Sequence, residues 1–68
     1  MILTIQLEQE TDGRWIAEVV DLPGTLVYGV TLEEATAKVK ALALRVLADR
    51  LEHGETDAGL GDVAFVAA

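Results

Sequence analysis

The side chains that could do chemistry in this 68-residue chain are almost all carboxylates. Cysteine is absent and His53 is the single histidine, so neither a Ser-His-Asp nor a Cys-His arrangement can be assembled. The carboxylates nearest to predicted strand ends are Glu8, Glu10, Asp12, Glu18 and Asp21. A magnesium site needs several oxygen ligands around one position, and the pattern does not place any of these side chains together in a buried cleft. We therefore expect a protein that is not an enzyme, with no catalytic residue, no cofactor and no metal ion.

Charge and composition narrow the class of partner. Twelve Asp and Glu against five Lys and Arg give a net charge of −7, which disfavours direct binding to nucleic acid and favours a basic protein partner. The apolar runs are too short to span a membrane, and the N-terminus lacks the basic region of a signal peptide, so we expect a cytoplasmic protein and no membrane contact. A domain this small buries only about 60% of its unfolded surface. Without disulfides, we expect self-association or a protein partner to supplement its core.

The first half of the chain predicts three strands. Apolar and polar residues alternate over 2–9, a second apolar segment covers 14–20, and Asp12-Gly13 between them is typical of a turn. The register that joins the two apolar faces pairs Leu7 with Ala17 and Ile5 with Val19. Pro23 and Gly24 fit the central positions of a type II turn. A short third strand follows over 25–30, in which Gly29 weakens the strand or marks a bulge.

The second half predicts one long helix and a last strand. Thr31 and Glu34 form a capping box, the helix covers 32–52, and His53 and Gly54 suit its C-terminal end. A polar loop over 55–61 leads to a strand over 62–67. The order β-β-β-α-β predicts a single α+β domain over 1–68. Its four-stranded sheet is an antiparallel meander plus a last strand parallel to the first, with the helix on one face. The predicted core is Leu3, Ile5, Leu7, Trp15, Ala17, Val19, Leu32, Ala35, Val39, Leu42 and Val46, and Tyr28 is interpreted as a second core aromatic.

Two features predict an interface between copies of the chain. The polar strip of the helix is narrow, and Leu44, Leu47 and Leu51 are spaced as a ridge on its second half, which is expected to overhang the sheet. The last strand, with Val63 and Phe65, is uncharged and has no Pro or Lys to protect a sheet edge. We expect a homo-oligomer, most simply a dimer. The sequence leaves open whether the helix or the strand forms the main contact.

Part of the chain resembles the HicB-like family of antitoxins. The matching residues are Asp12-Gly13, Trp15-Ile16-Ala17-Glu18-Val19, Asp21-Leu22-Pro23-Gly24, Gly29 and Thr31-Leu32-Glu33-Glu34-Ala35. The resemblance implies a partial ribonuclease H fold whose last strand joins beside the first. It also implies a partner, a small basic ribonuclease toxin whose active site the antitoxin masks. Many members carry a separate DNA-binding domain, which we do not expect within 1–68.

Two functions therefore stand as hypotheses. The first is a non-enzymatic antitoxin-like protein that binds and masks a small basic toxin. The alternative is a stand-alone oligomeric binding module of the same fold with no toxin partner. The sequence does not distinguish between these two functions. Whether the neighbouring gene encodes a small basic toxin would distinguish them.

Overall fold

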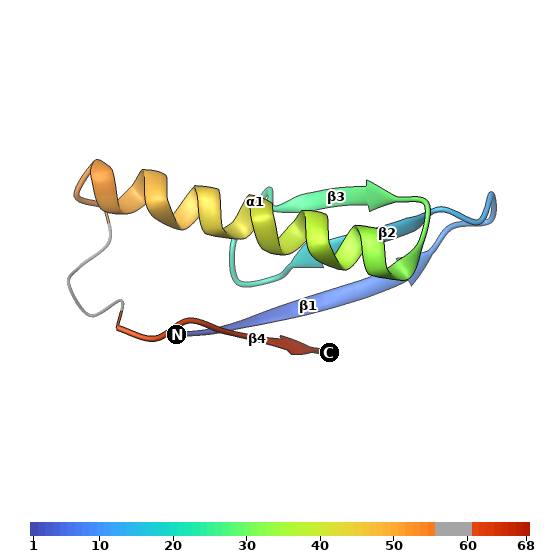
Figure 1. Ribbon diagram of the computed structural model, residues 1–68, viewed down its shortest axis with the longest axis horizontal. Coiled ribbons are helices and arrows are strands. Elements are labelled where there is room, and N and C mark those ends of the chain that lie inside the picture. The colour runs from blue at the N-terminus through green and yellow to red at the C-terminus, as the bar shows by residue number, and fades with distance from the viewer. Residues whose placement is uncertain (56–60) are drawn as a thin grey trace.

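The computed structural model describes residues 1–55 and 61–68 and has the predicted α+β architecture. The elements are β1 (Ile2–Gln9), β2 (Trp15–Val19), β3 (Leu26–Gly29), α1 (Leu32–Glu52) and β4 (Ala64–Ala67). The strand order is β3-β2-β1-β4, with β4 parallel to β1 and the other two pairings antiparallel. Helix α1 lies over one face of this sheet, and β4 forms one of its edges (Figure 1). The predicted layout is confirmed.

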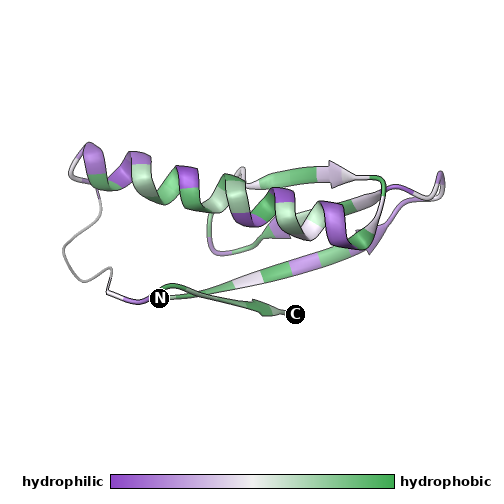
Figure 2. Ribbon diagram, viewed as in Figure 1, coloured by the Kyte–Doolittle hydropathy of each residue, from purple (hydrophilic) through white to green (hydrophobic). Residues whose placement is uncertain are grey.

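The predicted element boundaries hold for the longest elements and shift for the short ones. β1 and α1 have the predicted bounds, whereas β2, β3 and β4 are each shorter than predicted. Most of the predicted loop over 55–61 lies outside the described residues. Figure 2 shows β4 as an almost continuously hydrophobic strand, whereas hydrophobic and hydrophilic residues interchange along α1.

The predicted register between β1 and β2 is confirmed. Ile5 lies opposite Val19 and Leu7 lies opposite Ala17. Three of these four side chains are buried in the core beneath α1, and Leu7 packs against it. A slip of one residue would move the whole apolar set to the other face, so the alternation in the sequence specifies one pairing.

Two turns use glycine where the chain must adopt positive φ. Gly13 (φ 93°) lies in the turn between β1 and β2, and Gly24 (φ 85°) lies in the connection to β3. The Thr25 amide donates to the Leu22 carbonyl at 3.1 Å, which closes a four-residue turn with Pro23 and Gly24 at its centre. The type II turn predicted from Pro-Gly is confirmed.

The C-terminal end of α1 is capped as the sequence predicts, whereas only one of the two hydrogen bonds of the predicted capping box is formed at its N-terminal end. The Thr31 hydroxyl accepts from the Glu34 amide at 3.0 Å, while the Glu34 carboxylate pairs with Lys38 Nζ at 2.9 Å. At the C-terminal end, the Gly54 amide donates to the Leu51 carbonyl and the Glu55 amide donates to the Arg50 carbonyl. With Gly54 at φ 67°, this is a Schellman motif.

Gly29 has a different role from the predicted one. It is buried in β3, and a Cβ added to it would lie 2.5 Å from the backbone N of Ala35 and 2.8 Å from its Cα. The start of α1 therefore packs directly on the backbone of β3. Glycine is needed here for close approach, because any side chain would push the helix off the strand.

The core differs from the predicted set at its two ends. Leu32, predicted as core, is 38% exposed, because the first helical residue has neighbouring turns on one side only. Leu42 and Val46 are half-buried, whereas Leu47 is 3% exposed. The β2–β3 connection contributes two buried residues that the prediction omitted, Leu22 and Thr25. Leu22 belongs to the same buried cluster as Leu47, which lies on the second half of α1 and is buried within its own chain.

Candidate protein-binding surface

Charge is divided unequally between the helix and the rest of the chain. The α1 segment carries four cations and four carboxylates, which cancel. Outside it, eight carboxylates face a single cation, Arg14, so the whole surplus of −7 belongs to the sheet, the turns and the loops. Five of the eight, Glu8, Glu10, Asp12, Glu18 and Asp21, lie on β1 and β2 or in the turns that follow them. The sheet side of the molecule therefore offers an acidic surface to a basic partner.

The face of the sheet opposite α1 is open and carries apolar side chains among its carboxylates. Alternation along the strands places on it the residues that do not face the core, and several large ones are partly exposed: Ile2, Val20, Leu26, Tyr28 and Val66. Tyr28, interpreted from the sequence as a core aromatic, is 44% exposed on this face. Side chains at successive strand positions point to opposite faces, and Val27 beside it takes the core-facing position. A surface of mixed apolar and acidic character suits a protein partner.

A shallow depression lies on this face where β4 ends beside β1. Its volume is about 400 Å³, and it is lined by Gln6, Leu7, Glu8, Ile16, Glu18 and Ala68. Gln6 is paired opposite Glu18 and Glu8 opposite Ile16, so the two carboxylates are diagonal neighbours across the strands. Such neighbours are roughly 7–8 Å apart at Cα, a spacing that one guanidinium or ammonium group can bridge.

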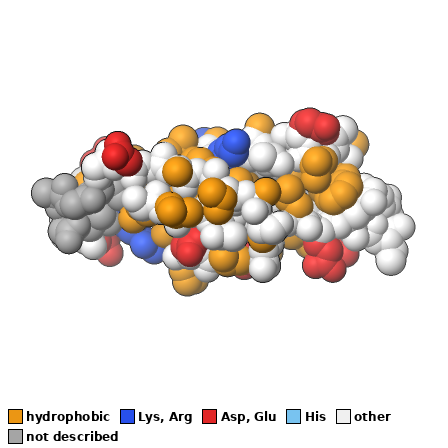
Figure 3. Space-filling view, turned by 90° about the horizontal axis from the view of Figure 1, so that it is seen from below, with side chains coloured by type: hydrophobic (Ala, Val, Ile, Leu, Met, Phe, Trp, Pro, Cys, Tyr) orange, Lys and Arg blue, Asp and Glu red, His pale blue; other side chains and the backbone are white. Residues whose placement is uncertain are grey.

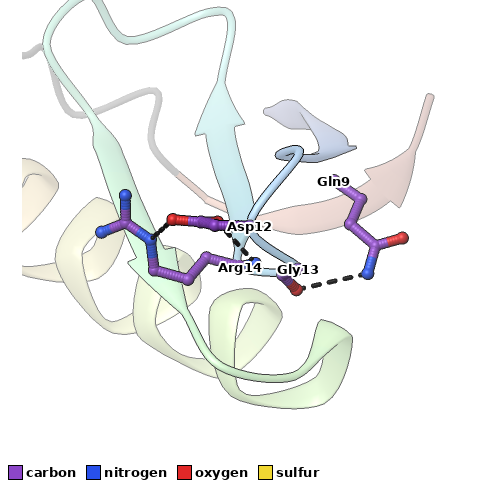
Figure 4. A network of polar contacts seen from close by, with 4 residues as sticks. All are labelled: Gln9, Asp12, Gly13 and Arg14. Atoms are coloured by element: carbon purple, nitrogen blue, oxygen red, sulfur yellow. Dashed lines mark hydrogen bonds and ion pairs between the residues drawn. The ribbon is translucent and has the colours of Figure 1, made fainter.

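Arg14, the cation outside α1, already contacts Asp12 in its own turn. Arg14 Nε donates to Asp12 Oδ2 at 2.8 Å, the Arg14 amide donates to Asp12 Oδ1 at 3.0 Å, and the Gln9 side chain donates to the Gly13 carbonyl (Figure 4). The hydrogen bond from the Arg14 amide, followed by the contact with its guanidinium, lowers the pKa of Asp12 below its usual range. The guanidinium also lies 4.8 Å from the centre of the Tyr28 ring. Glu8 and Glu18, the carboxylates of the depression, take part in none of the ion pairs within the described part of the chain.

Asp21 has a structural role rather than a place in the depression. Its Oδ2 accepts from the Thr4 amide at 2.6 Å, and the Val20 amide donates to the Thr4 carbonyl at 3.1 Å. Asp21 therefore holds the end of β2 against β1, where the antiparallel ladder stops.

The residues predicted for an interface between copies lie in three different settings. Leu44 and Leu51 are half exposed, as predicted. Leu47 is buried in the core, so placing it on an exposed ridge was wrong; it continues the core-facing row of Ala35, Val39 and Ala43, which are spaced by four residues. Val63 and Phe65 are half-buried against the core, and Lys40 Nζ lies 5.8 Å from the centre of the Phe65 ring. Figure 3 views the molecule from the side of β4, where hydrophobic side chains gather in the middle and acidic ones lie toward the margins.

The end of α1 gathers three groups that could in principle ligate a metal ion. Ligand atoms of Asp49, His53 and Glu55 all lie within 4.8 Å of one another, and all three residues are exposed. His53 Nδ1 is 2.7 Å from the Asp49 carbonyl oxygen, which can only accept, so Nδ1 carries the proton. This ring nitrogen completes the helix end instead of being available as a ligand, in agreement with the predicted capping role of His53.

Comparisons with protein-family models, with curated proteins and with solved structures found no match to this chain. Over the part of the chain that the structure describes, no helix combines the length and the apolar character needed to cross a membrane. The case for function therefore depends on the geometry and charge of the described surface, together with the motifs in the sequence.

Proposed function

We propose that this chain is a non-enzymatic, antitoxin-like protein that binds a small basic ribonuclease and masks its active site. The observation that carries the proposal is the concentration of the −7 surplus outside α1, together with the Glu8–Glu18 pair on the open sheet face. A ribonuclease that binds a phosphate backbone needs a cationic surface. An acidic sheet face is the complement of such a surface.

The depression gives the proposed contact a specific form. Ile16 provides an apolar part of the lining, with Glu8 directly opposite it on β1 and Glu18 two positions further along β2. An arginine of the partner would lay its stem on Ile16 and share its guanidinium between the two carboxylates. Exposed apolar residues around the depression, such as Leu26 and Val66, would form the rest of the contact.

The motif resemblance supports the same function from a separate direction. It implies a basic toxin as partner, and the β-β-β-α-β layout with β4 beside β1 agrees with the fold that it implies. We do not favour a nuclease activity of this chain, because the core-facing positions of β1 are Leu3, Ile5 and Leu7 rather than carboxylates.

Co-expression with the product of the adjacent gene tests this proposal. If that gene encodes a small basic protein, we expect its expression alone to arrest growth and co-expression with this chain to restore it. The variant Glu8→Lys/Glu18→Lys should fail to restore growth. The variant Glu33→Lys/Glu55→Lys, which changes the same number of exposed carboxylates away from the sheet, should succeed. An adjacent product that does not bind this chain, or equal rescue by both variants, would contradict the proposal.

A further inference from the structure

The solvent-facing side of α1 carries a continuous apolar seam. It consists of Ala37, Ala41, Leu44, Ala48 and Leu51, all of which are exposed. Their spacing of four, three, four and three residues keeps them within an arc of about 80° at 100° per residue. Ala35 and Val39, which face the core, lie on the opposite side of the helix. The seam is therefore a second apolar face, and the packing of α1 on its own sheet does not use it.

The repeat identifies the kind of element that fits this seam. Apolar residues alternating at three and four positions form the contact line between two helices, in which each side chain enters a space between residues of the facing helix. The alanines allow the two backbones to approach closely, and the leucines fill the contact. A similar stripe on the other side of α1 packs on the chain's own sheet, but the interleaved alanines and leucines of this seam suit the close approach of a second helix. We therefore take a helix as the occupant.

Charge selects a second copy of the chain as that occupant. A pair of identical chains with −7 each would repel wherever their acidic surfaces meet. The α1 segment is neutral overall, with four carboxylates balanced by four cations. Helix α1 therefore offers an extended surface on which two copies can meet without repulsion between their acidic surfaces. A basic partner, by contrast, gains most on the sheet side.

We infer that two copies of this chain associate through the α1 seam, with the two helices antiparallel. In an antiparallel register centred near residue 46, Leu44 faces Ala48 of the second copy, and Leu51 faces Ala41. Each large side chain then meets a small one, which a parallel register would not achieve, because there each leucine would meet its own equivalent.

The charges beside the seam favour the same direction. Lys38, which also pairs with Glu34 of its own chain, lies on the same flank as Glu52. The antiparallel pair would bring Lys38 and Glu52 of opposite copies together twice and Arg45 beside its own equivalent once, near the axis. A parallel pair would instead bring Lys40 beside Arg45 twice. The antiparallel dimer also leaves both open sheet faces outward, because each lies on the other side of its sheet from α1 (Figure 1).

Sedimentation equilibrium of purified full-length variants tests this inference. We expect the parent chain to be a dimer and Leu44→Glu/Leu51→Glu to be a folded monomer, with its helical circular dichroism retained because both side chains are half exposed. Leu47→Glu is unsuitable here, since it would place a charge in the core. The matched control is Val66→Glu on the edge strand β4, which should remain a dimer. A monomeric parent chain, a dimeric Leu44→Glu/Leu51→Glu variant or a monomeric Val66→Glu variant would overturn the inference.

A distance between spin labels tests whether the two helices are antiparallel. The chain has no cysteine, so Glu33→Cys introduces a single attachment point for a spin label. In the antiparallel pair, the two labelled positions are separated by roughly 39 Å along the helix axes, from 26 residues at 1.5 Å each. In a parallel pair they would be separated by little more than the interhelical distance of about 8–10 Å. A distance in the short range would overturn the antiparallel arrangement.

Discussion

Replacing Gly29 by alanine is the sharpest test of how α1 is seated on the sheet. The added Cβ would lie 2.5 Å from the backbone N of Ala35, 2.8 Å from its Cα and 2.9 Å from its Cβ. Ordinary contact begins at 3.4 Å, so the strand and the helix would have to separate by about 1 Å. Two of the three opposing atoms belong to the backbone, which has no rotamer with which to move away.

The expected cost follows from this overlap. Inserting a methyl group into a tightly packed site costs about 1–3 kcal/mol. The smaller entropy of the unfolded chain with alanine recovers about 0.4–1 kcal/mol. A net loss of about 1–2 kcal/mol is a large share of the stability of a 68-residue domain, which is roughly 3–10 kcal/mol. In a domain of this size it lowers the melting temperature by about 4–16 °C.

Thermal and urea unfolding of three variants would measure this effect. Gly61→Ala is the matched control, because its Cβ would meet nothing within 4 Å and its φ is not positive, so it should be neutral. Gly29→Ala/Ala35→Gly should not recover stability, since the backbone atoms of residue 35 remain in place. A Gly29→Ala variant that melts within about 2 °C of the parent chain would refute the close seating of α1 on β3.

Three further predictions concern the core, acid stability and the end of the β1–β2 ladder. Leu47→Ala should cost about 2–5 kcal/mol in urea unfolding, because the side chain is buried, whereas Val30→Ala at an exposed position should change stability by no more than about 0.5 kcal/mol; equal effects would place Leu47 outside the core. The hydrogen bond from Lys38 lowers the pKa of Glu34 in the folded chain, so Glu34 is protonated at a higher pH in the unfolded chain than in the folded one. The stability that the Glu34 carboxylate contributes is therefore present above the usual glutamate pKa and is lost as the pH falls through the lowered pKa of the folded chain. Glu34→Gln should flatten this part of the acid-unfolding profile. Asp21→Ala should cost about 1 kcal/mol and speed hydrogen exchange at the Thr4 amide, and unchanged exchange would contradict the contact.

The fold was predictable from the sequence because its strongest signals are local and agree with each other. The alternation over 2–9 permits one register with β2, and the Pro23-Gly24 and Thr31-Glu34 pairs mark a turn and a helix start that the structure confirms. The errors concern the packing of one element on another rather than the pattern within an element. Gly29 was interpreted as a weak strand residue because its close contact with the start of α1 appears only when the helix is packed on β3. Leu47 lies at the margin of the core-facing side of α1, and only the packing shows that it is buried.

The candidate site was only partly predictable. The charge imbalance between α1 and the rest of the chain can be counted from the sequence. The depression, however, depends on the cross-strand pairs that place Glu8 opposite Ile16 and diagonally from Glu18. Tyr28 was misassigned because the face of a residue in so short a strand depends on the register with β2, which places Tyr28 opposite Ile16 on the open side and Val27 opposite Ala17 on the core side.

The central claim is that the open, acidic face of the sheet binds a basic protein, and a calorimetric titration measures it most directly. The ligand is the purified small basic product of the adjacent gene, titrated into the parent chain, into Glu8→Gln/Glu18→Gln and into the control Glu33→Gln/Glu55→Gln. We predict at least a tenfold weaker affinity for the sheet-face variant, an affinity close to the parent's for the control, and weaker binding of the parent chain at higher salt. Equal affinity of both variants for the basic protein would contradict the assignment of this face as the binding surface.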